Sequence, residues 1–190
     1  MNRSKIYALL VPVVSVIIAL LIASIIIIII GKNPLTAYGI MLEGAFGGAE
    51  QLANTIIKMT PLILTGLAVG FGFRAGVFNI GAEGQMTIGA LMGAVVAMNI
   101  GGVPSVIAIP LSIIVGMLAG AFWASIAGFL KAFTGAHEVI STIMLNWIAA
   151  NFASFMVTGP LAVGSGTPKS PEIAEAAKLP VVLKVQATEL

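Results

Sequence analysis

Residues 73–85 read FRAGVFNIGAEGQ, and this partly polar stretch lies between two long apolar segments. It holds an arginine, an asparagine, a glutamate and a glutamine, separated by glycines and alanines. A soluble linker would be more polar than this, and an ordinary membrane helix would be less polar. Whether the apolar segments on either side lie in water or in a membrane therefore decides the class of protein.

The composition of the chain indicates that the surroundings are a lipid bilayer. Hydrophobic residues make up 59% of the 190 residues and charged residues only 8%, with a mean hydropathy of +1.11. An ordinary soluble domain has about 25% charged residues. A soluble chain of this length could not hide so much apolar surface, because its exterior would still need polar cover. We therefore expect an all-α, polytopic membrane protein.

The apolar runs between the few charges predict about five transmembrane helices. Roughly 20 apolar residues cross a hydrocarbon core, and the first run is uncharged from Ile6 to Gly31. The alternative for this run is a cleaved signal peptide. A signal peptide has an apolar region of roughly 7–15 residues and an A-x-A-like cleavage site after it. This run is longer and no such site follows it, so we expect an uncleaved first helix. The expected spans are approximately 6–31, 52–73, 80–99, 103–130 and 138–158.

The third of these spans is irregular. Its apolar part alone, residues 85–98, is too short for a full crossing. Either the helix begins earlier and takes Asn79 and Glu83 into the bilayer, or the backbone is broken near Gly81. Irregular backbone at membrane depth is tolerated where protein covers it or where it lines a water-filled cavity. We expect a broken or re-entrant segment near 75–85.

The basic residues predict the orientation of the chain. The positive-inside rule places Arg3 and the N-terminus in the cytoplasm, and alternate crossings then place Arg74 and Lys131 there as well. Residues 1–158 form the expected transmembrane region. Residues 159–190 are polar and rich in turn-forming residues, and they form the expected external loop.

The sequence offers little material for catalysis or metal binding. It contains no cysteine and a single histidine, and its seven acidic residues are all glutamates. A thiol nucleophile, a Ser-His-Asp site and a cysteine-based metal site are therefore excluded. No G-x-x-x-x-G-K-[ST] phosphate loop is present. The net charge of +2 is too small to indicate a nucleic-acid partner. We expect no catalytic residue, metal or cofactor on this chain.

Pairs of glycines at four-residue spacing indicate helices that pack on helices. Small residues at this spacing let two membrane helices approach closely. With 22 glycines in the chain, some pairs arise by chance, so the signal is a general one. The pairs are Gly66/Gly70, Gly72/Gly76, Gly89/Gly93 and Gly116/Gly120.

Two long motifs resemble a known family. FRAGVFNIGAEGQMTIGA at 73–90 and HEVISTIMLNWIA at 137–149 are similar to the permease subunits of bacterial ABC importers for nucleosides. These belong to a larger group that handles simple sugars and branched-chain amino acids. Shorter supporting pieces are NPLTAY at 33–38, PLILTGLAVGF at 61–71 and VQATEL at 185–190.

The resemblance implies a permease that lines a nucleoside pathway in the bacterial cell membrane. Its expected partners are a second permease subunit, a cytoplasmic ABC ATPase that binds and hydrolyses the ATP, and an external substrate-binding lipoprotein. Family members are longer, with further crossings and a segment that docks on the ATPase, so we expect this chain to cover the N-terminal half. The alternatives are a cargo of simple sugars or branched-chain amino acids, or a stand-alone channel or ion-coupled carrier.

The candidate pathway residues are polar or aromatic side chains within the two motifs. An ionisable group inside a membrane is a functional candidate by default, although Glu83 has two other readings: a pair with Arg74, or a favourable place at a helix N-terminus. An aromatic ring in a span can stack on a nucleobase, but it more often provides packing. The candidates are Asn79, Glu83 and Gln85, with Asn146 and Trp147 on a facing helix.

Overall fold

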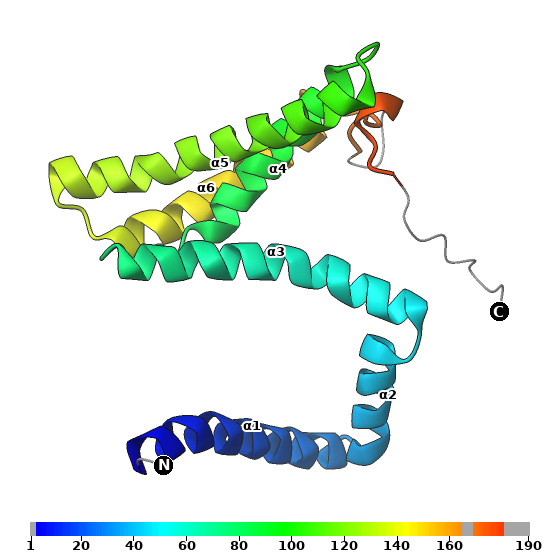
Figure 1. Ribbon diagram of the computed structural model, residues 1–190, viewed down its shortest axis with the longest axis vertical. Helices are drawn as coiled ribbons and strands as arrows, with labels where there is room; N and C mark the ends of the chain where they lie inside the picture. The colour runs from blue at the N-terminus through cyan, green and yellow to red at the C-terminus, as the bar shows by residue number, and fades with distance from the viewer. Residues whose placement is uncertain (1–2, 165–168, 181–190) are drawn as a thin grey trace. The chain divides into compact units, whose positions relative to one another are not determined.

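The computed structural model describes residues 3–164 and 169–180, with side chains from Leu10 onward. These ranges contain helices and no strand, which confirms the all-α expectation (Figure 1). The helices are α1 (Arg3–Ile29), α2 (Pro34–Phe46), α3 (Ala49–Arg74), α4 (Ala82–Asn99), α5 (Ser105–Thr134) and α6 (Glu138–Thr158), followed by one 3₁₀ turn, η1 (Glu175–Ala177).

Four helices are long and apolar enough to cross a membrane. They are α1 over Leu10–Ile29, α3, α5 and α6. Each coincides with an expected span to within a few residues at either end. The chain is therefore a multi-pass membrane protein. The third expected span, 80–99, is also a helix, α4, but this helix of 18 residues is not among the four.

The described chain divides into two compact units, with the division inside α3 between Lys58 and Met59. In the first unit, the hydroxyl of Tyr38 on α2 donates to the carbonyl oxygen of Leu20 on α1 at 2.6 Å. The same hydroxyl lies 3.1 Å from Oγ of Ser24. These contacts join α1 to α2 through polar groups.

The helix α2 was not among the expected elements, although the sequence carries its start signal. The side chain of Asn33 accepts a hydrogen bond from the backbone N–H of Leu35 at 2.9 Å, and Pro34 occupies the first helical position. Asparagine at the cap and proline in the first turn are typical of helix starts. With 13 residues, α2 is shorter than a membrane span requires.

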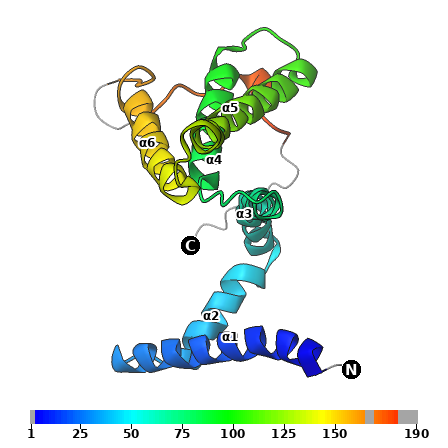
Figure 2. The ribbon, with the colours of Figure 1, turned by 90° about the vertical axis from the view of Figure 1, so that its left-hand side faces the viewer.

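In the second unit, α4, α5 and α6 lie side by side (Figure 1, Figure 2). The buried apolar residues of this unit are mostly alanines, with Ile88 and Leu91 of α4 as the larger members. Large apolar side chains instead face outward along the helices. Small residues between helices and large residues outside are expected where lipid covers the exterior, because close packing rather than water exclusion holds membrane helices together.

The contact between α4 and α5 leaves no space for side chains at its centre. A Cβ atom built on Gly89 would lie 2.8 Å from the carbonyl oxygen of Gly116, and one built on Gly116 would lie 2.9 Å from that of Gly89. Farther along, Gly120 lies against Gln85 and Gly93 against Ser112. The two helices are therefore antiparallel and in backbone contact.

The segment after α6 docks on the same pair of helices. The backbone N–H of Ala174 donates to the carbonyl oxygen of Ala97 at 2.8 Å. This carbonyl belongs to the last turn of α4, where helix carbonyls lack partners within the helix. Ala177 of η1 is buried in a cluster with Ala97 and Ala108. The described part of the predicted external loop thus covers one end of the α4–α5 pair.

We expect Gly89→Ala to destabilise the second unit, because its Cβ atom would meet the backbone of Gly116, which cannot move aside as a side chain can. Overpacking of this kind costs about 1–3 kcal/mol. The measurement is the midpoint of thermal unfolding of the purified protein in detergent. The matched control is Gly128→Ala, whose Cβ atom meets nothing within 4 Å. Equal midpoints for the two variants would contradict the close contact.

Candidate functional site

The segment between α3 and α4 is irregular, as expected for residues near 75–85. The last turn of α3 ends at Arg74, and α4 begins at Ala82. The chain leaves α3 through Gly76, whose φ of 75° favours glycine. Across this turn the rings of Phe73 and Phe78 pack edge to face, with centroids 4.5 Å apart. The break in the helix is therefore an ordered turn.

Two of the candidate residues bind each other beside this turn. The side-chain oxygen of Asn79 accepts from Nε2 of Gln85 at 3.0 Å and from the backbone N–H of Gly81 at 2.9 Å. The Nδ2 group of Asn79 lies 3.3 Å from Oε1 of Gln85, to which it donates. Asparagine bonded to the backbone two residues on is a common turn device. These two amides therefore stabilise the irregular segment.

A third candidate, Asn146, joins α6 to the start of α4. Its Oδ1 accepts from the backbone N–H of Gly84 at 2.9 Å. Its Nδ2 donates to the carbonyl oxygen of Ile80 at 3.0 Å. Gly84 is buried, and a Cβ atom there would lie 2.8 Å from Oδ1 of Asn146. The first turn of α4 is thus held against α6 by one carboxamide.

An ion pair makes a further link between the irregular segment and the α5–α6 turn. Nζ of Lys131 lies 2.7 Å from Oε1 of Glu138. The same ammonium donates to the carbonyl oxygen of Gly76 at 3.3 Å, and the backbone N–H of Phe78 donates to Glu138 at 3.4 Å. Both charged side chains therefore also form hydrogen bonds with the backbone of the irregular segment.

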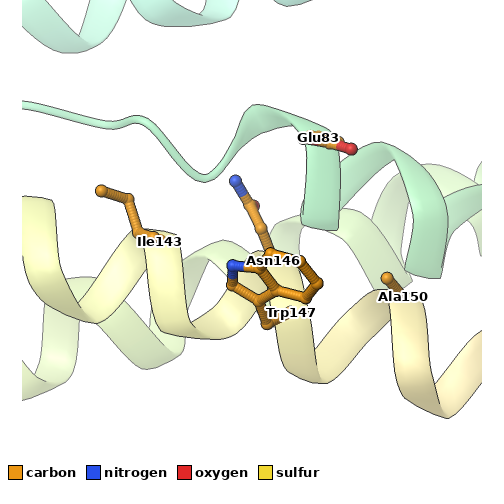
Figure 3. A pocket seen from close by; sticks show the side chains of 5 residues that line it. All are labelled: Glu83, Ile143, Asn146, Trp147 and Ala150. Carbon is orange, nitrogen blue, oxygen red and sulfur yellow. The ribbon is translucent and has the colours of Figure 1, made fainter.

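A pocket opens between the first turn of α4 and one face of α6 (Figure 3). We call it the Glu83 pocket; Glu83, Ile143, Asn146, Trp147 and Ala150 line it. Three candidates thus come together here, and α6 does face α4 as expected. Asn79 and Gln85 are not among the lining residues. Trp147 is 68% exposed, so its ring is open to a ligand or to a packing partner.

The structure separates the alternatives for Glu83. The described residues contain two ion pairs, Lys131–Glu138 and Glu175–Lys178, so Glu83 and Arg74 do not form one there. Glu83 does lie in the first turn of α4, where the helix dipole favours a negative charge. Its side chain is exposed, and within the described part of the chain its carboxylate has no hydrogen-bond partner. That carboxylate is therefore a free polar group of the pocket among the described residues.

Some residues of the pocket were missed by the sequence reasoning. Ile143 and Ala150 complete the lining on α6. Their spacing from Trp147, four and three residues, places all three on one helix face. That periodicity could have identified them once Trp147 was chosen. The roles of Gly84 and of the Lys131–Glu138 pair had no such local signal.

Comparison with known proteins identifies the family. The family described as "Branched-chain amino acid transport system / permease component" matches residues 51–186, and the chain belongs to this family. The family is described as a permease component of a transport system, so the chain belongs to a family of transport components. No solved structure matches the chain.

Three curated relatives are each similar over most of this chain. A glucose ABC transporter permease protein of Haloferax volcanii is 38% identical over 170 residues, which is 89% of this chain and 44% of the relative. A nucleoside ABC transporter permease protein of Lactococcus lactis is 38% identical over 82% of this chain and 43% of the relative. A guanosine ABC transporter permease protein of Bacillus subtilis is 39% identical over 80% of this chain and 44% of the relative. The chain thus spans less than half the length of these relatives.

We expect the pairing of Asn79 with Gln85 to be visible in a double-mutant cycle. Asn79→Ala and Gln85→Ala should each lower the unfolding midpoint, because each leaves the other amide without its partner. A hydrogen bond of this kind contributes about 0.5–1.5 kcal/mol. The double variant should therefore lose less than the two single losses together. Fully additive losses would show that the two amides do not interact.

Proposed function

We propose that this chain lines the translocation pathway of an ATP-driven ABC importer for nucleosides. Membership of the permease family supports a transport role, and two of the three relatives above are permeases whose names state a nucleoside or guanosine. The observation that carries the proposal is the Glu83 pocket, which brings a free carboxylate and an exposed indole ring together at a break between helices. Interrupted helices commonly form transport sites.

The chemistry of the pocket suits a neutral polar cargo with an aromatic part. Sugar hydroxyls and base N–H groups are donors, and the carboxylate of Glu83 accepts hydrogen bonds. The indole of Trp147 offers a face on which a base can stack. No cationic side chain is among the lining residues, so the pocket does not favour an anionic cargo.

The proposed transporter needs other components. We propose that a separate cytoplasmic ABC ATPase binds and hydrolyses the ATP, that a second permease subunit completes the pathway, and that an external lipoprotein delivers the cargo. The chain would lie in the bacterial cytoplasmic membrane with its N-terminus in the cytoplasm. The basic residues Arg74 and Lys131, each in the last turn of a long helix, support this orientation.

A sugar is the second candidate cargo, since one relative is named a glucose permease. Sugars lack the flat base that would use Trp147. Competition of labelled guanosine uptake by unlabelled nucleosides, sugars and branched-chain amino acids separates the two cargoes. Uptake after reconstitution of this permease without an ATPase would instead indicate a stand-alone channel or an ion-coupled carrier.

We expect Glu83→Gln in the complete transporter to raise the KM for nucleoside uptake by about tenfold, because a hydrogen bond to a charged group contributes about 1.5–3 kcal/mol. The measurement is initial uptake of labelled guanosine into membrane vesicles, corrected for the amount of permease present. Glu175→Gln is the control, since that carboxylate lies on η1, away from the pocket residues in sequence, and its side chain is 87% exposed. Unchanged uptake by the Glu83 variant would overturn the proposed site.

A further inference from the structure

We infer that Asn146 is a positioning residue, whose carboxamide holds the first turn of α4 so that Glu83 and Trp147 face the same pocket. This inference rests on the proposed function. In this role Asn146 does not contact the cargo. It fixes the positions of Glu83 and Trp147, which do.

The two hydrogen bonds of Asn146 enclose Glu83 in the sequence. One goes to the carbonyl oxygen of Ile80, three residues before Glu83, and the other comes from the N–H of Gly84, the residue directly after it. The segment that carries Glu83 is therefore held on both sides. Only a side chain that both donates and accepts can make this pair of bonds, and a short carboxamide does so.

The absence of a side chain at Gly84 makes the link possible. A Cβ atom at this position would lie 2.8 Å from Oδ1 of Asn146, 3.0 Å from its Cα atom and 3.2 Å from the carbonyl oxygen of Leu145. Two of these three atoms are backbone atoms, which cannot rotate away. The start of α4 thus lies directly on the backbone of α6, within reach of the short Asn146 side chain.

The same link sets the separation between the two groups left for a cargo. Each end of the carboxamide forms one hydrogen bond with the backbone, which leaves the Glu83 carboxylate and the Trp147 ring as an exposed charged group and an exposed aromatic group of the pocket. Trp147 follows Asn146 directly on α6. Figure 3 shows the amide nitrogen of Asn146 directed toward the chain that leads into α4, with Glu83 on the turn beyond it. Moving Asn146 would therefore move the carboxylate relative to the ring.

The first test measures the position of residue 83 without reference to transport. The 190 residues contain no cysteine, so Glu83→Cys supplies the single thiol within them; any cysteine elsewhere in the transporter is replaced before labelling. Its rate of reaction with a water-soluble maleimide is measured in membranes that contain the complete transporter, alone and combined with Asn146→Asp or Asn146→Leu. Asn146→Asp keeps the acceptor for the N–H of Gly84 but loses the donor to the carbonyl oxygen of Ile80, and Asn146→Leu loses both.

We expect both Asn146 variants to change the labelling rate by about threefold or more, since loss of a hydrogen bond, which contributes about 0.5–1.5 kcal/mol, is enough to shift a local equilibrium by that factor. The control is Asn151→Leu on the same helix, whose amide, among the described residues, donates to the carbonyl oxygen of Trp147 within α6. It should leave the labelling rate unchanged. Labelling rates equal to the unsubstituted background for both Asn146 variants would overturn the inference.

The second test asks whether the effect of Asn146 on uptake passes through Glu83. Asn146→Leu should raise the KM for guanosine about tenfold when Glu83 is present and much less in the Glu83→Gln background, because coupled residues give non-additive effects. Additive effects on KM, or a loss confined to the amount of permease in the membrane, would overturn the positioning role. If Glu83→Gln leaves uptake unchanged, the proposed site fails, and the labelling rates alone then decide whether Asn146 holds residue 83.

Discussion

The backbone of α4 lies against the backbones of α5 and α6 with no room for a Cβ atom at the contact points. Gly89 meets Gly116 on α5, and Gly84 meets Asn146 on α6. In a membrane there is little hydrophobic driving force between helices, so their attraction depends on such close approach and on hydrogen bonds. Both the buried cluster of small residues and the pocket beside Glu83 depend on this constraint.

The close packing of α4 on its neighbours also determines which groups the polar residues of the 73–85 stretch bond to. The irregular segment between α3 and α4 leaves backbone groups that need hydrogen-bond partners outside a helix. Asn79 supplies one of them within the segment, Asn146 supplies two from α6, and the Lys131–Glu138 pair supplies two more. Once these bonds are made, the carboxylate of Glu83 is left over. Glu83 is thus exposed, while its polar neighbours bond to the backbone.

The sequence reasoning succeeded where the signal was local. Long apolar runs predicted α1, α3, α5 and α6, and the partly polar stretch predicted the irregular segment before α4. It missed α2, because its apolar stretch is short and its start signal, Asn33 with Pro34, was read only as part of a motif. Of the glycine pairs, Gly89/Gly93 and Gly116/Gly120 do lie in a helix contact, whereas Gly66 and Gly70 have nothing within 4 Å of a built Cβ atom. Spacing alone cannot tell these cases apart.

The sequence by itself determined the class of this protein: its charge-poor, apolar composition requires a membrane, and the run lengths set most of its helices. Its motifs also pointed to the permease family. Only the tertiary structure decided how the five candidate residues divide, with Asn79 and Gln85 bound to each other and Glu83, Asn146 and Trp147 around one pocket. The physical reason is that hydrogen bonds such as that from Gly84 to Asn146 join residues 62 positions apart. Which residues meet at that distance depends on helix packing, and no local pattern of residues encodes it.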